Sequence, residues 1–267
     1  MFLHRHTVVH MIYGVLLCSG IAWLYVRSLY IWELLDKVVI KGIFKKEMYG
    51  MSDRNDDKVI ACRFVSISLV TYSSWLLVEW YIGRAYRFGT PSLMNLIKTG
   101  VQVVLLMLGP CYEQFPFFWQ FKRADIMIFI RNIIVAPLFE EIVFRAFFWE
   151  ILTHSGCSFT FTVILAPVLF ALSHMHGNSS SMSVGDSIGT VVHTCIFGWI
   201  AFYFFVTRSV WDAVLAHALC NCIGLPNRTV RKSKYYSVNP KILYVMGLTL
   251  FLLTSMPLSV WELFLRI

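Results

Sequence analysis

The chain consists largely of long apolar runs separated by shorter polar segments, and this pattern restricts the fold more than any other feature. Hydrophobic residues make up 58% of its 267 positions and charged residues only 14%, with a mean hydropathy of +0.66. Soluble domains carry about 25% charged residues. A membrane span needs about 20 mostly apolar residues in a helix, which satisfies its own backbone groups where water is absent. The sequence therefore predicts an all-α, polytopic integral membrane protein.

Eight apolar stretches have the length of a membrane span, which predicts about eight transmembrane helices. No internal repeat, low-complexity tract or second domain separates them, so we expect one transmembrane domain over residues 1–267. The first stretch resembles a signal peptide, but its long apolar core and the lack of a clear small-residue cleavage site favour an uncleaved span. The predicted spans lie near residues 8–26, 61–82, 92–111, 126–148, 158–174, 187–206, 210–225 and 241–262.

The distribution of lysine and arginine predicts the orientation of the chain. With eight spans, one side of the membrane receives six of these residues and the other fifteen, mostly in the loops 27–60 and 227–241. The side richer in positive charge normally faces the cytoplasm. We therefore attribute the net charge of +8 to the orientation of the chain in the membrane and to attraction to anionic lipid. No nucleic-acid partner is expected. The six residues are Arg5, Arg84, Arg87, Lys98, Arg208 and Arg266.

The seven cysteines lie within or at the ends of the predicted spans and show no paired spacing. Neither a disulfide framework nor a zinc ribbon follows from them. Buried cysteines usually behave as small apolar residues, and we interpret these in that way. They are Cys18, Cys62, Cys111, Cys157, Cys195, Cys220 and Cys222.

The fourth predicted span carries two carboxylates and an arginine, and ionisable residues inside a span are functional candidates by default. Glu141 and Arg145 are four residues apart, so they share a helix face and can form an ion pair. We expect this pair to be structural. Glu140 lies about 100° around the helix and has no basic partner at helical spacing. It is therefore the candidate for chemistry.

Two further groups of polar residues follow on later spans. His174 ends the fifth predicted span, and His217 and Asn221, four residues apart, share one face of the seventh. Two aligned polar residues in a span are harder to explain by packing than one. His176, just outside its span, and His193, without an aligned partner, are interpreted as structural.

In the predicted orientation these groups can meet in one cavity that opens to the cytoplasm. The chemistry that fits them is hydrolysis by an activated water. Glu140 can act as a general base, and His174 can orient the water or share its proton. His217 and Asn221 can donate hydrogen bonds to the oxyanion that forms when a peptide carbonyl is attacked. No serine has the setting of a nucleophile elbow.

The stretches EEIVFRAFF, FALSHMH and HALCNCIGLP, in this order on successive spans, resemble the three motifs of the type II CAAX prenyl endopeptidases, the Ras-converting endopeptidases. The stretch TCIFGWIAFYFF is also similar to that family, which belongs to the CAAX protease and bacteriocin-processing superfamily. The similarity covers roughly residues 130–226, within a predicted catalytic core of about 126–226.

The resemblance implies a metal-independent, cofactor-free glutamate protease of the endoplasmic reticulum membrane. Such an enzyme removes the last three residues from C-a-a-X proteins that carry a farnesyl or geranylgeranyl group, such as small GTPases. By motif position, Glu140 and His174 activate water and His217 and Asn221 form the oxyanion hole, whereas Glu141 and Arg145 are structural. The segment 177–192 departs from the family because it is short and holds no lysine or arginine. Substrate and prenyl preference remain open.

Other functions are compatible with the same residues. Glu140, His174 and His217 form a donor set that zinc accepts, although no HExxH motif is present and Asn221 would have no role. A thiol protease using Cys220 or Cys222 beside His217 is a further alternative. A non-catalytic membrane scaffold would use these residues only for packing, and a transporter is disfavoured because no inverted repeat is found.

The predicted orientation can be tested through two sequons, at Asn178 and Asn227, which both fall in loops placed on the cytoplasmic side. Neither should carry a glycan, because N-glycosylation takes place on the lumenal side. An endoglycosidase-sensitive mass shift that is lost in Asn227→Gln would invert the orientation.

Overall fold

The computed structural model describes residues 2–35, 53–114, 126–177, 183–224 and 239–255, with side chains from residue 8 onwards. Regular secondary structure within these ranges is entirely helical, which confirms the predicted all-α class for this part of the chain. The helices are α1 (Phe2–Ser28), α2 (Ile31–Leu35), α4 (Asp57–Ile82), α5 (Leu93–Leu106), α6 (Leu108–Gln114), α7 (Ile126–Phe129), η3 (Ile130–Val135), α8 (Ala136–Glu141), η4 (Ile142–Phe147), α9 (Phe148–His154), α10 (Phe159–Ser173), η5 (His174–Gly177), α11 (Val184–Thr207), α12 (Val210–Ile223) and α13 (Pro240–Ser255).

Several sequence predictions fall outside the described residues. They include both sequons, at Asn178 and Asn227, much of the basic loops 27–60 and 227–241, and the last residues of the predicted span 241–262. The orientation that rests on these loops therefore stays a prediction.

Three of the described helices are long and apolar enough to cross a membrane, and they match the first, second and sixth predicted spans. The shorter apolar helices α5, α10, α12 and α13 hold 14–16 residues. At about 1.5 Å per residue they are roughly 21–24 Å long, below the roughly 30 Å of a hydrocarbon core. A helical membrane protein is supported, and the number of eight spans stays a prediction. The three long segments are Val8–Ser28, Asp57–Ile82 and Val184–Thr207.

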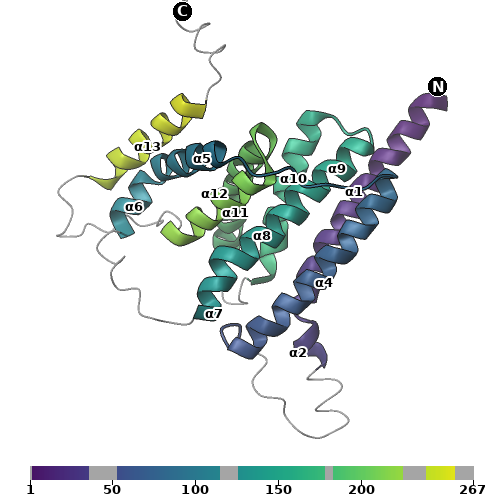
Figure 1. The fold of residues 1–267 in the computed structure, drawn as a ribbon, viewed down its shortest axis with the longest axis horizontal. Helices are drawn as coiled ribbons and strands as arrows, with labels where there is room; N and C mark the ends of the chain where they lie inside the picture. Colours follow the sequence, from purple (N-terminus) through teal and green to yellow (C-terminus); the bar gives the residue numbers. More distant parts are fainter. Residues whose placement is uncertain (1, 36–52, 115–125, 178–182, 225–238, 256–267) are drawn as a thin grey trace, which may run out of the picture.

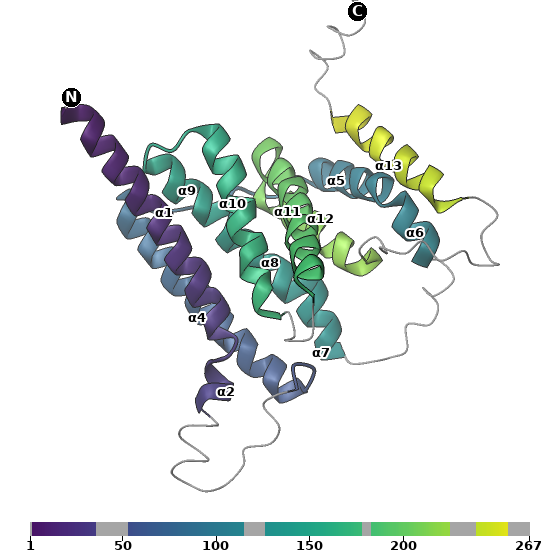
Figure 2. The ribbon, with the colours of Figure 1, turned by 180° about the vertical axis from the view of Figure 1, so that it is seen from behind.

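The helices pack in two flanks around a central group. α1 and α4 lie side by side on one flank, and α5, α6 and α13 lie together on the other (Figures 1 and 2). Between them, α10 packs on α11 and α11 on α12, while α12 also contacts α5 and α8. The helical path from α7 to α9 runs through this central group, so its residues are reached from several other helices (Figure 1).

This central path continues to His154, six residues beyond the predicted end of the fourth span at 148. It ends before Gly156, whose φ of 82° is the left-handed conformation that favours glycine after a helix. Two π-helical segments, η3 and η4, interrupt it. Pro137 accounts for the first, because a proline cannot donate to the carbonyl four residues earlier and its ring clashes with that carbonyl. π-helical segments occur frequently at functional sites.

The third predicted span, 92–111, was expected as one helix and is found as two. The break falls at Met107, where α5 ends and α6 begins with the next residue. Pro110 lies in the first turn of α6, where its missing N–H is tolerated. Inside a longer helix the same proline would remove a hydrogen bond, which explains why the helix restarts here.

The central path supplies most of the largest buried side chains. The phenylalanines of η4 and α9 are almost fully buried, and these two elements contact α1, α4, α10 and α11. Tyr25 packs edge-on against Phe144 from α1, and Phe170 does so from α10, with ring centroids 5.5 and 5.3 Å apart. Such packing fixes the direction in which the preceding residues of α8, Glu140 and Glu141, point. The core residues of the path are Val143, Phe144, Ala146, Phe147, Phe148, Ile151 and Leu152.

α1 approaches α9 closely at Gly14. A Cβ atom added to Gly14 would lie 2.1 Å from Ser155 Oγ and 2.7 Å from Ser155 Cβ. Ser155 has little freedom to move, because its hydroxyl donates to Ile151 O at 2.6 Å and contacts Tyr81 Oη at 2.9 Å. Small residues allow helices in a membrane to approach one another in this way.

We predict that Gly14→Ala destabilises the fold by about 1–3 kcal/mol, the usual cost of overpacking. Gly20→Ala on the same helix is the matched control, since a Cβ there meets nothing within 4 Å, and its effect should stay within about 0.5 kcal/mol. Thermal unfolding of both variants in detergent measures the difference. Equal stability of the two variants would contradict the close approach of α1 and α9.

Candidate functional site

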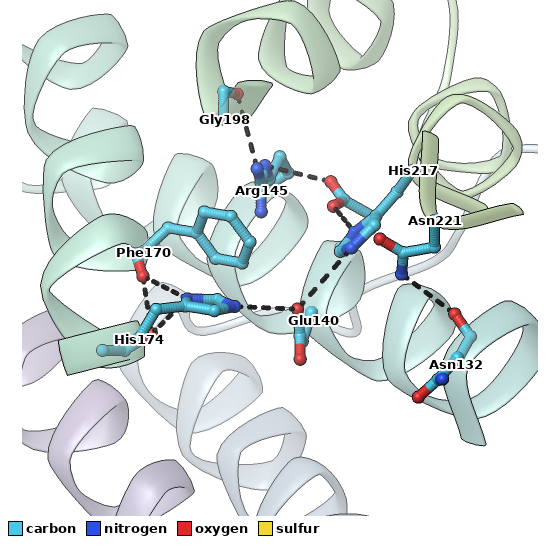
Figure 3. A network of polar contacts seen from close by, with 10 residues as sticks. Asn132, Glu140, Arg145, Phe170, His174, Gly198, His217 and Asn221 are labelled. Atoms are coloured by element: carbon cyan, nitrogen blue, oxygen red, sulfur yellow. Dashed lines mark hydrogen bonds and ion pairs between the residues drawn. The ribbon is translucent and has the colours of Figure 1, made fainter. Parts of the chain in front are cut away.

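The structure brings together the polar residues that the sequence singled out on three separate helices. Glu140 and Glu141 end α8, His174 follows the last residue of α10, and His217 and Asn221 lie one turn apart on α12. Figure 3 shows the Glu140 carboxylate between the rings of His174 and His217. These residues come from elements that are far apart in sequence, so the packing of α8, α10 and α12 assembles the site.

Glu140 faces both imidazoles at nearly equal distance. Its Oε2 atom lies 3.8 Å from His174 Nε2 and 3.9 Å from His217 Nε2. These separations are too long for direct hydrogen bonds. A polar contact beyond 3.5 Å is often bridged by one water. The sequence analysis found no basic partner for Glu140 on its own helix, and the structure supplies two imidazoles from other helices.

The ring of His174 is oriented by Phe170 on the preceding turn of α10. His174 Nδ1 lies 2.9 Å from the carbonyl oxygen of Phe170. A carbonyl only accepts hydrogen bonds, so Nδ1 carries the proton in this contact. A neutral ring then presents an unprotonated Nε2 to Glu140. The two rings also pack edge-on, with centroids 4.5 Å apart.

The ring of His217 is oriented by Glu141. His217 Nδ1 lies 2.7 Å from Glu141 Oε1, a distance typical of a hydrogen bond to a carboxylate. Nδ1 is therefore the donor, and Nε2 points toward Glu140. The sequence analysis assigned Glu141 only to Arg145, so this second role was missed. No local signal reveals it, because the contact depends on the packing of α8 against α12.

The predicted pairing of Glu141 with Arg145 is found, and it is buried. Arg145 Nε lies 3.0 Å from Glu141 Oε2, and both side chains are at most 1% exposed. The guanidinium carbon also lies 4.0 Å from the ring centroid of Phe170, and Nη2 donates to Gly198 O at 3.4 Å. A buried charge needs such compensation. One arginine thus links α8, α10 and α11 beneath the two imidazoles.

Asn221 contacts the main chain of the central path. Its Nδ2 atom donates to the carbonyl oxygen of Asn132, in the π-helical segment η3, at 2.9 Å (Figure 3). An amide nitrogen has two hydrogens, so one remains for a further acceptor. Asn132 was not predicted from the sequence, and no pattern indicates it because a backbone carbonyl makes the contact.

A cavity of about 150 Å³ adjoins these residues. His174, His217 and Asn221 form part of its wall, and the buried pair of Glu141 and Arg145 forms another part. Glu140 is not among its lining residues, although both imidazoles that line the cavity also face Glu140.

His193, which the sequence analysis interpreted as structural, does not line the cavity. The ring of His193 packs against Phe197, with centroids 5.0 Å apart, while the side chain of His176 lies outside the described residues. All seven cysteines are free thiols, as their spacing predicted. Among the described residues, no group of three His, Cys, Asp or Glu side chains is arranged to hold a metal ion.

The fold and site define a helical membrane protein with a partly buried group of two carboxylates and two imidazoles. Residues 122–223 match the family described as type II CAAX prenyl endopeptidase Rce1-like. The chain is 30% identical over 196 residues to the probable CAAX prenyl protease 2 of Schizosaccharomyces pombe, covering 65% of this chain and 71% of that protein. It is 27% identical over 283 residues to CAAX prenyl protease 2 of Homo sapiens, covering 91% and 80%. No solved structure matches.

The chain therefore belongs to the type II CAAX prenyl endopeptidase family, as the resemblance of its three motifs predicted. A third relative, CAAX prenyl protease 2 of Caenorhabditis elegans, is 28% identical over 202 residues and matches 66% of this chain and 75% of its own length.

We predict that Arg145→Ala destabilises the protein by about 3–5 kcal/mol, because the buried charge of Glu141 loses the guanidinium that compensates it. Arg84→Ala is the matched control. Arg84 pairs with Glu150 at 2.7 Å, but its side chain is 61% exposed, and exposed pairs contribute about 0–1 kcal/mol. Thermal unfolding in detergent compares the two. A similar loss in both variants would show that the buried pair does not support the site.

Proposed function

We propose that this chain is an intramembrane glutamate-type endopeptidase that removes the C-terminal tripeptide from prenylated C-a-a-X proteins, small GTPases among them. The observation that carries the proposal is the position of Glu140. Its carboxylate faces two imidazole nitrogens, and the other nitrogen of each ring donates a hydrogen bond that orients the ring. The names of the related proteins support the substrate class.

In this proposal Glu140 and His174 hold the attacking water. Glu140 Oε2 and His174 Nε2 are both acceptors 3.8 Å apart, and a water has two O–H donors, so one molecule satisfies both. Its lone pair is then free to attack the scissile carbonyl carbon. Glu140 takes a proton from the water as general base. That proton passes to the leaving amine when the C–N bond breaks, and His174 takes up the second proton of the water. The products are a prenylcysteine carboxylate and the free tripeptide.

His217 and Asn221 stabilise the oxyanion in this proposal. Asn221 has its second amide hydrogen for this purpose. In this role His217 carries a hydrogen on each ring nitrogen. Nε2 donates to the oxyanion, and Nδ1 keeps its hydrogen bond to Glu141 Oε1, 2.7 Å away, which fixes the direction of the ring. Glu141 is thus a positioning residue for His217 as well as the partner of Arg145.

The proposed setting is the endoplasmic reticulum membrane, with residues 1–267 as a single domain of eight spans and the site opening to the cytoplasm. The continuous path from Ile126 to His154 is long enough for a fourth span beside the three long helices. α2 and the starts of α4 and α7 lie together at one end of the bundle (Figure 1). Arg131 donates to Arg54 O there at 2.7 Å, and Arg54 belongs to the basic loop 27–60, which supports a cytoplasmic end.

The central experiment uses the purified protein and a prenylated C-a-a-X peptide, with products weighed by mass spectrometry. The wild type should release the intact tripeptide and leave an unprenylated peptide largely uncut. Glu140→Gln should lower kcat by about 10²–10⁴-fold, the usual contribution of a general base, while its thermal unfolding stays close to that of the wild type.

The same assay with a chelator present tests the alternative of a zinc site. We propose a metal-independent, cofactor-free reaction, so a strong chelator should leave the wild-type rate unchanged. Loss of activity in the chelator, with recovery on addition of zinc, would assign Glu140 and the two imidazoles to metal binding instead.

The oxyanion hole yields a separate prediction. Asn221→Ala should lower kcat by about 10²–10³-fold with little change in KM, because the lost hydrogen bond matters most in the transition state. Cys222→Ser, at the next position of α12, is the control and should retain activity, as should Cys220→Ser. Inactivity of either serine variant would favour a thiol protease, and an unchanged kcat in Asn221→Ala would remove Asn221 from the oxyanion hole.

A further inference from the structure

The wall of the cavity beside the two imidazoles has a polar part and an apolar part. His174, His217 and Asn221, which the proposed reaction uses, belong to the polar part, together with Thr194 and the ion pair of Glu141 and Arg145. The apolar part comes from α10, α11 and α12. Its residues are Phe170, Phe197, Ile200, Ala201, Ala216 and Cys220.

The volume of the cavity limits which group of the substrate can bind inside it. An apolar cavity of about 150 Å³ in another protein stays dry and binds benzene, and the volume here is about 150 Å³. One branched aliphatic or phenyl side chain is of that size. A farnesyl chain has more than twice as many carbons as benzene, so the prenyl group cannot lie wholly within the cavity.

The direction of the bound peptide limits further which substrate residue can enter the cavity. The imidazoles that face Glu140 also line the cavity, so a side chain inside it belongs to a residue close to the cleaved bond. The residue before that bond carries the prenyl group, which cannot lie wholly within the cavity. Neighbouring side chains of an extended peptide point to opposite sides, so the cavity receives one of the two aliphatic residues after the bond and not both.

We propose that this cavity is the specificity pocket for one aliphatic residue of the released tripeptide, with Ile200, Ala201 and Ala216 setting its depth. The inference rests on the proposed endopeptidase function. Ala201 and Ala216 are at most 4% exposed, so larger residues at these positions would project into space that the substrate side chain otherwise fills. Ile200 is half-buried, and its truncation would enlarge the same space.

The test measures kcat/KM for prenylated peptides in which each aliphatic position carries in turn alanine, valine, leucine or phenylalanine. In the wild type, one position should favour valine or leucine over alanine by about 10–200-fold, the range that apolar pockets achieve. Ala216→Val should shift the side-chain preference at that position toward alanine. Ile200→Ala should raise the rate for phenylalanine at the same position, and a gain of activity cannot come from misfolding.

Ile196→Ala is the control, because Ile196 lies one turn earlier on α11, is 45% exposed and does not line the cavity. It should leave the preference at both positions unchanged. Cleavage by all variants with an unaltered side-chain preference would overturn the pocket while leaving the endopeptidase intact. A change in farnesyl against geranylgeranyl preference in Ile200→Ala would also overturn it. Failure of the wild type to cut any prenylated peptide would overturn the proposed function itself, and the pocket with it.

Discussion

The buried carboxylate of Glu141 is the interaction on which the rest of the site depends. It lies between Arg145 Nε at 3.0 Å and His217 Nδ1 at 2.7 Å, and it is fully buried. The arginine in turn packs on Phe170, whose carbonyl oxygen orients His174. One charge pair therefore sets the rotation of both imidazoles that face Glu140. Glu141, which the sequence pairs only with Arg145, thus helps to determine the geometry of a site formed by three helices.

Two adjacent glutamates thus have different roles because they face different surroundings. Glu141 points into the packed interior, where Arg145 compensates its charge, since an unpaired carboxylate there would destabilise the fold. Glu140 is 16% exposed and has no guanidinium within ion-pair distance among the described residues, only two imidazole nitrogens nearly 4 Å away. In the proposed reaction a water occupies that space. The proposal therefore assigns Glu141 to the stability of the fold and Glu140 to turnover.

Much of this arrangement follows from local sequence patterns. The spacing of Glu141 and Arg145 predicts their ion pair, and the spacing of His217 and Asn221 predicts their shared face. The break at Met107 could be predicted from the nearby Pro110, although the hydrophobic pattern runs through it. The contacts of Glu141 with His217 and of Asn221 with Asn132 could not, because they depend on how α12 packs against α8 and η3. Periodicity along one helix carries no information about the partner that another helix supplies.

The central claim is that Glu140 and His174 hold a water for attack on a peptide bond. A structure of the purified protein, at a resolution that shows ordered water, would test it most directly. The account predicts a water within about 2.6–3.2 Å of both Glu140 Oε2 and His174 Nε2, the range of a hydrogen bond, and no metal in the same sample by elemental analysis. A zinc ion bound by Glu140, His174 and His217, with stoichiometric zinc in solution, would contradict it.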